Sequence, residues 1–124
     1  MWSPITWRTE EDYDMQFGVN HLGHFLLTEL LMPLIKKSSM TPGFKPRIIN
    51  VSSLAGLSGS INQRKLELYT KEHQKEKWSL LPLASAAAYN DSKLANVLHA
   101  KALAKKLKFD GINTYSLHPG VIRK

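Results

Sequence analysis

The chain is 124 residues long, which fits one compact domain or part of a larger one. Hydrophobic residues make up 43% and charged residues 22%, and this balance excludes a disordered or low-complexity chain. Because there is no cysteine, a disulfide scaffold, a cysteine-ligated zinc site and a cysteine nucleophile are excluded as well. No apolar stretch reaches the roughly 20 residues of a membrane span, and no signal peptide is recognisable. We expect no membrane segment here, and a cytoplasmic or a membrane-associated parent protein would both fit.

The net charge of +7 is unevenly distributed. Residues 1–35 hold one basic and five acidic side chains, so the basic character belongs to residues 36–124. A basic surface can bind nucleic acid, but these lysines are scattered and no nucleic-acid motif accompanies them. We therefore expect a small anionic ligand, such as a nucleotide phosphate, and no nucleic acid as a partner.

The first third of the chain predicts one long helix. Thr9 and Asp12 resemble a capping box, and acidic residues from Glu10 onward favour a helix that begins there. Apolar residues then recur on most sides between positions 15 and 37, which is typical of a helix buried nearly all round. The Thr-Pro-Gly sequence at 41–43 ends the pattern.

Two short strands and a second helix follow. Residues 47–52 and 112–117 are β-branched runs that predict buried strands, and residues 84–108 predict a helix. The inward residues of this helix are Leu94, Val97, Leu98, Leu103 and Leu107. The polar stretch 62–78 is interpreted as an insertion with one or two exposed helical turns. Two strands joined by a helix form a βαβ unit with a parallel sheet, so the fold class is α/β. Because two strands cannot cover both helices, the sheet is expected to continue in other residues or in a partner.

Tyr89 and Lys93 lie four residues apart, on one face of the predicted 84–108 helix. A positive charge beside a phenol favours the phenolate, so such a pair can act as an acid or base near neutrality. The spacing alone more often indicates a packed tyrosine beside a solvated lysine. However, Ser52 and Ser53 follow the first strand, at the sheet edge where open α/β sheets bind ligands. A serine hydroxyl there can hold a substrate oxygen while the tyrosine transfers its proton.

The chain resembles the short-chain dehydrogenase/reductase family, in particular its retinol-dehydrogenase-like and WW-domain-oxidoreductase-like branch. The likeness rests on four ordered segments, FGVNHLGHFLLTELL, RIINVSSLAG, AYNDSKLANVLHAKALAKKL and INTYSLHPGVIR. It implies a partial Rossmann-type, doubly wound parallel sheet: the βαβ unit and the long helix before it. Residues 1–124 would be the C-terminal catalytic part of a single Rossmann-fold domain, with a polar insertion at about 57–82.

The resemblance implies four catalytic residues. Tyr89 would be the acid/base, and Ser53 would orient the substrate carbonyl or hydroxyl. Lys93 would bind the nicotinamide ribose and favour the ionised form of Tyr89, while Asn20 would support a water-linked proton path to Lys93. Ser53 matches the family pattern because a glycine stands three residues later, which leaves Ser52 a structural role.

The resemblance also implies where a cofactor would bind. Besides Tyr89 and Lys93, the segment that lies against the nicotinamide matches Pro119, Gly120, Val121 and Ile122. NADP is favoured over NAD by the branch. The glycine-rich loop that holds the pyrophosphate has no counterpart in this chain, which resembles a member without its first four strands. No metal is expected, and His21 and His24 are interpreted as packing or surface residues.

Two functions follow from these expectations. The first is an NAD(P)-dependent oxidoreductase that moves hydride between nicotinamide and a carbonyl or alcohol, with a retinoid- or lipid-like substrate by resemblance. The second is a truncated, non-catalytic product that acts by association or is inactive. The isolated 124-residue chain is itself expected to be inactive, and a homo-oligomer is compatible with either function.

Overall fold

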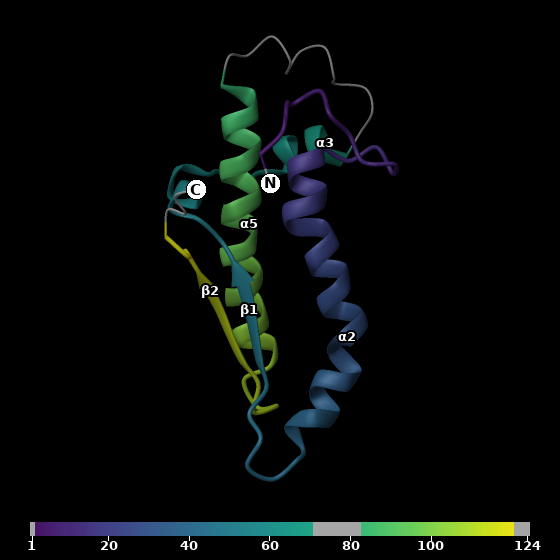
Figure 1. The fold of residues 1–124 in the computed structure, drawn as a ribbon, viewed down its shortest axis with the longest axis vertical. Coiled ribbons are helices and arrows are strands. Elements are labelled where there is room, and N and C mark those ends of the chain that lie inside the picture. The colour runs from purple at the N-terminus through teal and green to yellow at the C-terminus, as the bar shows by residue number, and fades with distance from the viewer. Residues whose placement is uncertain (1, 71–82, 121–124) are drawn as a thin grey trace.

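The computed structural model describes residues 2–70 and 83–120. Its elements are, in chain order, α1 (Met15–Phe17), the π-helical turn η1 (Gly18–Leu22), α2 (Gly23–Ser39), β1 (Arg47–Val51), the 3-10 helix η2 (Leu54–Ser58), α3 (Gln63–Thr70), α5 (Ala84–Lys106) and β2 (Asn113–Leu117). β1 and β2 pair in parallel, with Arg47 opposite Asn113 and Val51 opposite Leu117. Helix α5 packs on this two-stranded sheet, α2 lies beside α5, and both helices run opposite to the strands (Figure 1). The predicted α/β class and βαβ unit are confirmed.

Helix α5 packs closely against η2 because the contacting residues are small. A Cβ on Gly56 would lie 3.1 Å from the Leu94 nitrogen, and one on Gly59 would lie 2.7 Å from the Asn90 oxygen. Both glycines therefore let one backbone rest directly on the other. This contact fixes the chain that leaves β1 against the first half of α5.

The buried apolar side chains form two clusters, one toward each end of α5. One joins α2, the sheet and the end of α5: Met32, Ile48, Leu103, Leu107 and Ile112. The other joins α1, α3 and the first half of α5: Phe17, Tyr69, Ala88 and Ala95. Between the two clusters, the side chains buried on α5 include Asn96 and His99, so the middle of the helix has a polar interior.

The burial predicted for the long helix was wrong. Within α2, Met32 is the buried residue, whereas Leu26, Leu30 and Leu34 are 58%, 68% and 64% exposed. The helix is apolar on most sides as predicted, but a two-stranded sheet offers too little surface to cover it. Its apolar face therefore lies open to solvent.

The predicted start of this helix was also wrong. The helix begins at Met15, not at Glu10, because Asp12 adopts a left-handed conformation with φ of 64°. Asp14 is the N-cap, and its Oδ1 accepts a hydrogen bond of 2.8 Å from the Phe17 N–H. Burial raises the pKa of the Asp14 carboxyl.

The other predicted element boundaries lie closer to those in the structure. Both strands lie within one residue of their predicted ends, and α5 ends at Lys106 rather than at 108. Leu98, predicted to face inward, is 46% exposed. The predicted exposed turns of the 62–78 stretch are α3, but this helix buries Leu68 and Tyr69, and the remainder of the stretch from 71 onward lies outside the described residues. No helix of the described ranges is long and apolar enough to span a membrane.

Candidate active site

The side chains of Tyr89 and Lys93 meet at the C-terminal end of β1. The Lys93 Nζ lies 5.6 Å from the centroid of the Tyr89 ring and donates a hydrogen bond of 3.3 Å to the Val51 carbonyl. Lys93 is a buried residue, and burial lowers the pKa of its ammonium. The Trp2 ring lies beside the Tyr89 ring, tilted by 45°, with the two centroids 5.4 Å apart. An ammonium thus sits beside a half-buried phenol, at the sheet edge that the sequence indicated.

Asn20 reaches the same place from η1. Its Nδ2 donates to the Ser92 Oγ at 3.1 Å, and the Ser92 hydroxyl donates to the Tyr89 carbonyl at 2.7 Å. The backbone carbonyl of Asn20 accepts from the Asn96 Nδ2 at 3.0 Å and from the His24 ring at 3.2 Å. The structure therefore brings three of the four predicted catalytic residues together: Asn20, Tyr89 and Lys93.

The fourth residue, Ser53, lies at the start of η2. Its Oγ accepts from the Ala55 N–H at 3.2 Å, which leaves the hydroxyl proton to be donated elsewhere. Within the described ranges no hydrogen bond joins Ser53 to Tyr89 or Lys93. Ser52, in contrast, is buried and donates its hydroxyl to the Lys93 carbonyl at 2.6 Å, so it fastens β1 to α5.

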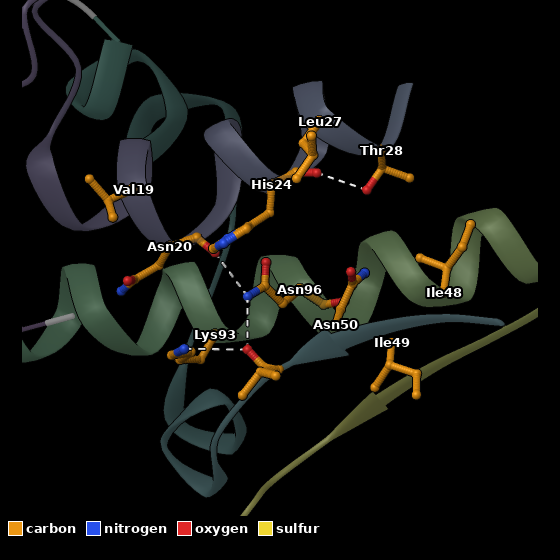
Figure 2. A pocket seen from close by; sticks show the side chains of 11 residues that line it. Val19, Asn20, His24, Leu27, Thr28, Ile48, Ile49, Asn50, Lys93 and Asn96 are labelled. Carbon is orange, nitrogen blue, oxygen red and sulfur yellow. Dashed lines mark hydrogen bonds between the residues drawn. The ribbon is translucent and has the colours of Figure 1, made fainter. Parts of the chain in front are cut away.

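A cavity of about 410 Å³ opens between α2, β1 and α5. Figure 2 shows side chains from all three elements pointing into it. Its polar lining includes Asn20, His24, Asn50, Lys93 and Asn96. The predicted residues Ser53 and Tyr89 lie outside this lining, so the cavity adjoins the proposed reacting groups without enclosing them.

The cofactor segment predicted after β2 is partly described. Pro119 and Gly120 follow the end of β2, and Gly120 has a positive φ of 91° that favours glycine. Because β1 and β2 are parallel and in register, this segment leaves the sheet at the same edge as Ser53. The other two predicted cofactor contacts, Val121 and Ile122, lie outside the described residues.

Other buried polar residues were not singled out in the sequence. Asp91 is 1% exposed and accepts from the Tyr69 hydroxyl at 2.6 Å and the Lys65 ammonium at 2.7 Å. Asn96 is buried as well, and its Oδ1 lies 3.0 Å from the Nδ1 of His21, which was interpreted as a packing or surface residue. The spacing of Asn96, three residues after Lys93, is the signal that would have placed it on the same face. Within the described ranges, no three His, Asp or Glu residues form a group able to hold a metal ion.

The comparisons with known proteins agree on one family. The chain is 44% identical over 117 residues to human retinol dehydrogenase 13, covering 94% of this chain and 31% of that protein. It is 44% identical over 115 residues to mouse retinol dehydrogenase 11, again covering 93% of this chain and 31% of the relative. The chain therefore spans about a third of the length of the curated relatives it matches. No sequence model of a protein family matches it.

The solved structures that it resembles have the same fold. A putative uncharacterized protein from Mycobacterium paratuberculosis superposes with a TM-score of 0.65 at 32% identity, covering 94% of this chain and 37% of that one. The predicted resemblance to the short-chain dehydrogenase/reductase family is confirmed. An NADPH-bound carbonyl reductase from chicken fatty liver superposes with a TM-score of 0.58 at 21% identity, covering 100% of this chain and 47% of the other. The partial Rossmann-type fold predicted for this chain is thus confirmed.

Proposed function

We propose that this chain carries the catalytic residues of an NAD(P)-dependent oxidoreductase that interconverts a carbonyl compound and an alcohol. The observation that carries the proposal is the position of the Lys93 ammonium, 5.6 Å from the Tyr89 ring and bonded to the last residue of β1. The Tyr89 phenol can donate and accept a proton, and the ammonium beside it can hold an oxygen of a bound cofactor or substrate.

Each residue has a distinct part in the proposed reaction. The bound nicotinamide would supply or accept the hydride. In reduction, the Tyr89 hydroxyl donates its proton to the carbonyl oxygen while hydride reaches the carbonyl carbon, which gives the alcohol. The Ser53 Oγ accepts a hydrogen bond from the Ala55 N–H, so its own proton remains available. This hydroxyl donates to the same substrate oxygen and orients it. Oxidation of the alcohol reverses both transfers.

The donor groups of the site fit the ribose of a nicotinamide cofactor. Lys93 has three N–H groups and within the described residues uses one, toward Val51, so the others can bond ribose hydroxyls. The segment from Pro119 to Ile122 would lie against the nicotinamide, and residues 1–124 would form the catalytic part of one Rossmann-fold domain. NADP is the preferred cofactor in this proposal, supported by the family branch and by the carbonyl reductase of the same fold that binds NADPH. A retinoid- or lipid-like substrate is proposed because the curated relatives are named retinol dehydrogenases.

Transfer of a labelled hydride tests the proposed function. The full-length protein is incubated with retinal or a long-chain aldehyde and with nicotinamide cofactor that carries deuterium at its reactive carbon. We expect deuterium on the former carbonyl carbon of the alcohol, and faster transfer from NADPH than from NADH. Absence of labelled alcohol with both cofactors and both substrates would contradict the proposal.

A further inference from the structure

The side-chain amide of Asn96 joins three elements at the candidate site. Asn96 belongs to α5 and is 4% exposed. Its Nδ2 donates to the Asn20 carbonyl of η1 at 3.0 Å and to the Val51 carbonyl of β1 at 3.1 Å, as Figure 2 shows. A single buried amide thus holds the π-helical turn and the end of the strand against α5.

The bonding partners allow this amide only one orientation. Both partners on one side are carbonyl oxygens, which accept, so the group that faces them must be the NH2 group. The Oδ1 then faces the His21 Nδ1 at 3.0 Å, which must carry the proton and donate it. Burial lowers the pKa of His21, which favours the neutral ring with this proton on Nδ1. Both N–H donors of the Asn96 amide and one acceptor position of its oxygen are therefore used.

Asn96 and Lys93 share one acceptor. The Lys93 Nζ donates to the same Val51 carbonyl, at 3.3 Å, from one helical turn earlier on α5. A carbonyl oxygen has two lone pairs, so the two donors reach it from different directions. Without Asn96, the Val51 carbonyl would be free to turn toward the ammonium, and the Asn20 carbonyl would lose a donor.

We infer that Asn96 is a positioning residue, which His21 holds in one orientation and which sets the place of the Lys93 ammonium relative to Tyr89 and Asn20. This inference rests on the proposed function, because it gives the lysine its place for binding the cofactor. The same geometry also makes a claim that is independent of activity: the surroundings of the Lys93 side chain change when the Asn96 amide is lost.

The test combines kinetics with a signal from Lys93 itself. Asn96→Leu, His21→Leu and Thr114→Val are made in the full-length protein. Thr114 serves as the control because its hydroxyl donates to the Ala100 carbonyl at 2.8 Å, a side-chain bond to α5 outside the site. We expect the KM for NADPH to rise about fivefold in Asn96→Leu, the factor that one net hydrogen bond represents, and to stay unchanged in Thr114→Val. A loss of folded protein alone lowers the apparent kcat and leaves this KM unchanged.

The second readout is the NMR signal of the Lys93 Cε in protein labelled with ¹³C-lysine, assigned through Lys93→Arg. We expect this signal to shift in Asn96→Leu and in His21→Leu, and not in Thr114→Val. His21→Leu removes one bond of the amide and leaves Asn96 in place, so it serves if Asn96→Leu does not fold. A wild-type protein without turnover would contradict the proposed function, whereas an unmoved Lys93 signal in the folded variants would overturn the positioning role.

Discussion

The hydroxyl of Tyr89 is the atom on which the proposed reaction depends. Tyr89→Phe removes it without opening a large cavity, so we expect cofactor binding to persist and turnover to be lost. Tyr115→Phe, on the exposed part of β2, is the matched control and should retain activity. Rates of retinal reduction and NADPH affinities measured on the full-length variants check this. If Tyr89→Phe kept more than about a tenth of kcat, a general acid/base role would be ruled out.

Lys93 is expected to affect both cofactor binding and chemistry. Lys93→Met keeps a long apolar side chain but removes the ammonium that lies beside Tyr89 and donates to Val51. We expect the KM for NADPH to rise and kcat to fall together, because the same ammonium would hold the ribose and so place the nicotinamide beside the Tyr89 hydroxyl. Lys101→Met, on the exposed face of α5, is the control. A fall in kcat with an unchanged cofactor KM would remove the ribose-binding role.

Tyr69 should make the folded chain sensitive to alkaline pH. Burial, and then the hydrogen bond to Asp91, raise the pKa of Tyr69 above the ordinary tyrosine value of 10.0. Because the folded pKa is the higher one, this contribution to stability is complete below pH 10 and is lost as the pH rises further. We expect the unfolding free energy of the wild type to fall by up to about 1.4 kcal/mol per pH unit more than that of Tyr69→Phe. Urea denaturation of both proteins at pH 9 and pH 11 gives the loss of unfolding free energy in each. Equal losses in the two proteins would contradict the prediction.

Among the elements, the contact of η2 with α5 is the least tolerant of added atoms. A Cβ on Gly59 would lie 2.7 Å from the Asn90 oxygen, so the two backbones must separate. We expect Gly59→Ala to lower the unfolding free energy by about 1–3 kcal/mol. Gly23→Ala is the control, because its Cβ would meet the Gly18 oxygen at an ordinary 3.6 Å and alanine favours helix. In chemical denaturation, the unfolding free energy of Gly23→Ala should be higher than that of the wild type, and that of Gly59→Ala should be lower.

Most elements could be predicted from the sequence because their signals are local. The period of apolar residues and the positions of glycine and proline locate α2, α5 and both strands. Where the long helix begins, at Met15 of α1, could not be predicted, since the acidic residues that resemble a helix start surround Asp12, whose left-handed conformation keeps the helix from starting there. The exposure of α2 agrees with the expectation that two strands cannot cover both helices, but hydrophobicity shows which face should be covered and not what covers it.

The residues of the candidate site also differ in whether a local signal in the sequence identifies them. Tyr89 and Lys93 could be found because one helical turn relates them, and Ser53 because it follows a strand. The spacing of Asn96 from Lys93 could have placed it on the same face of α5, but its partners could not be predicted, since its amide bonds carbonyls that lie 76 and 45 residues away in the chain. Such partners become neighbours only when the helices and the sheet have packed together.

For the molecule as a whole, the open side of α2 should govern behaviour in solution. Leu26, Leu30 and Leu34 are each more than half exposed, and a contiguous apolar surface of this kind promotes association. We expect a purified polypeptide of these 124 residues to self-associate, and Leu30→Glu with Leu34→Glu to reduce the association. Lys101→Glu with Lys105→Glu, on exposed positions of α5, is the control for added acidic charge. Light scattering would contradict the expectation if the unmodified polypeptide were a monodisperse monomer.

The π-helical turn η1 makes the number of residues in this part of the chain critical. A π turn holds about one residue more than an α turn, and one residue corresponds to about 100° of rotation about the helix axis. Deleting a single residue such as Val19 would leave a helix that is equally continuous and equally apolar. It would nevertheless turn α1 relative to the residues that follow Val19, so that Phe17 on one side and Asn20 and His21 on the other could not all keep their present partners. The number of residues in this turn, more than their hydrophobicity, must therefore be kept for these contacts to form.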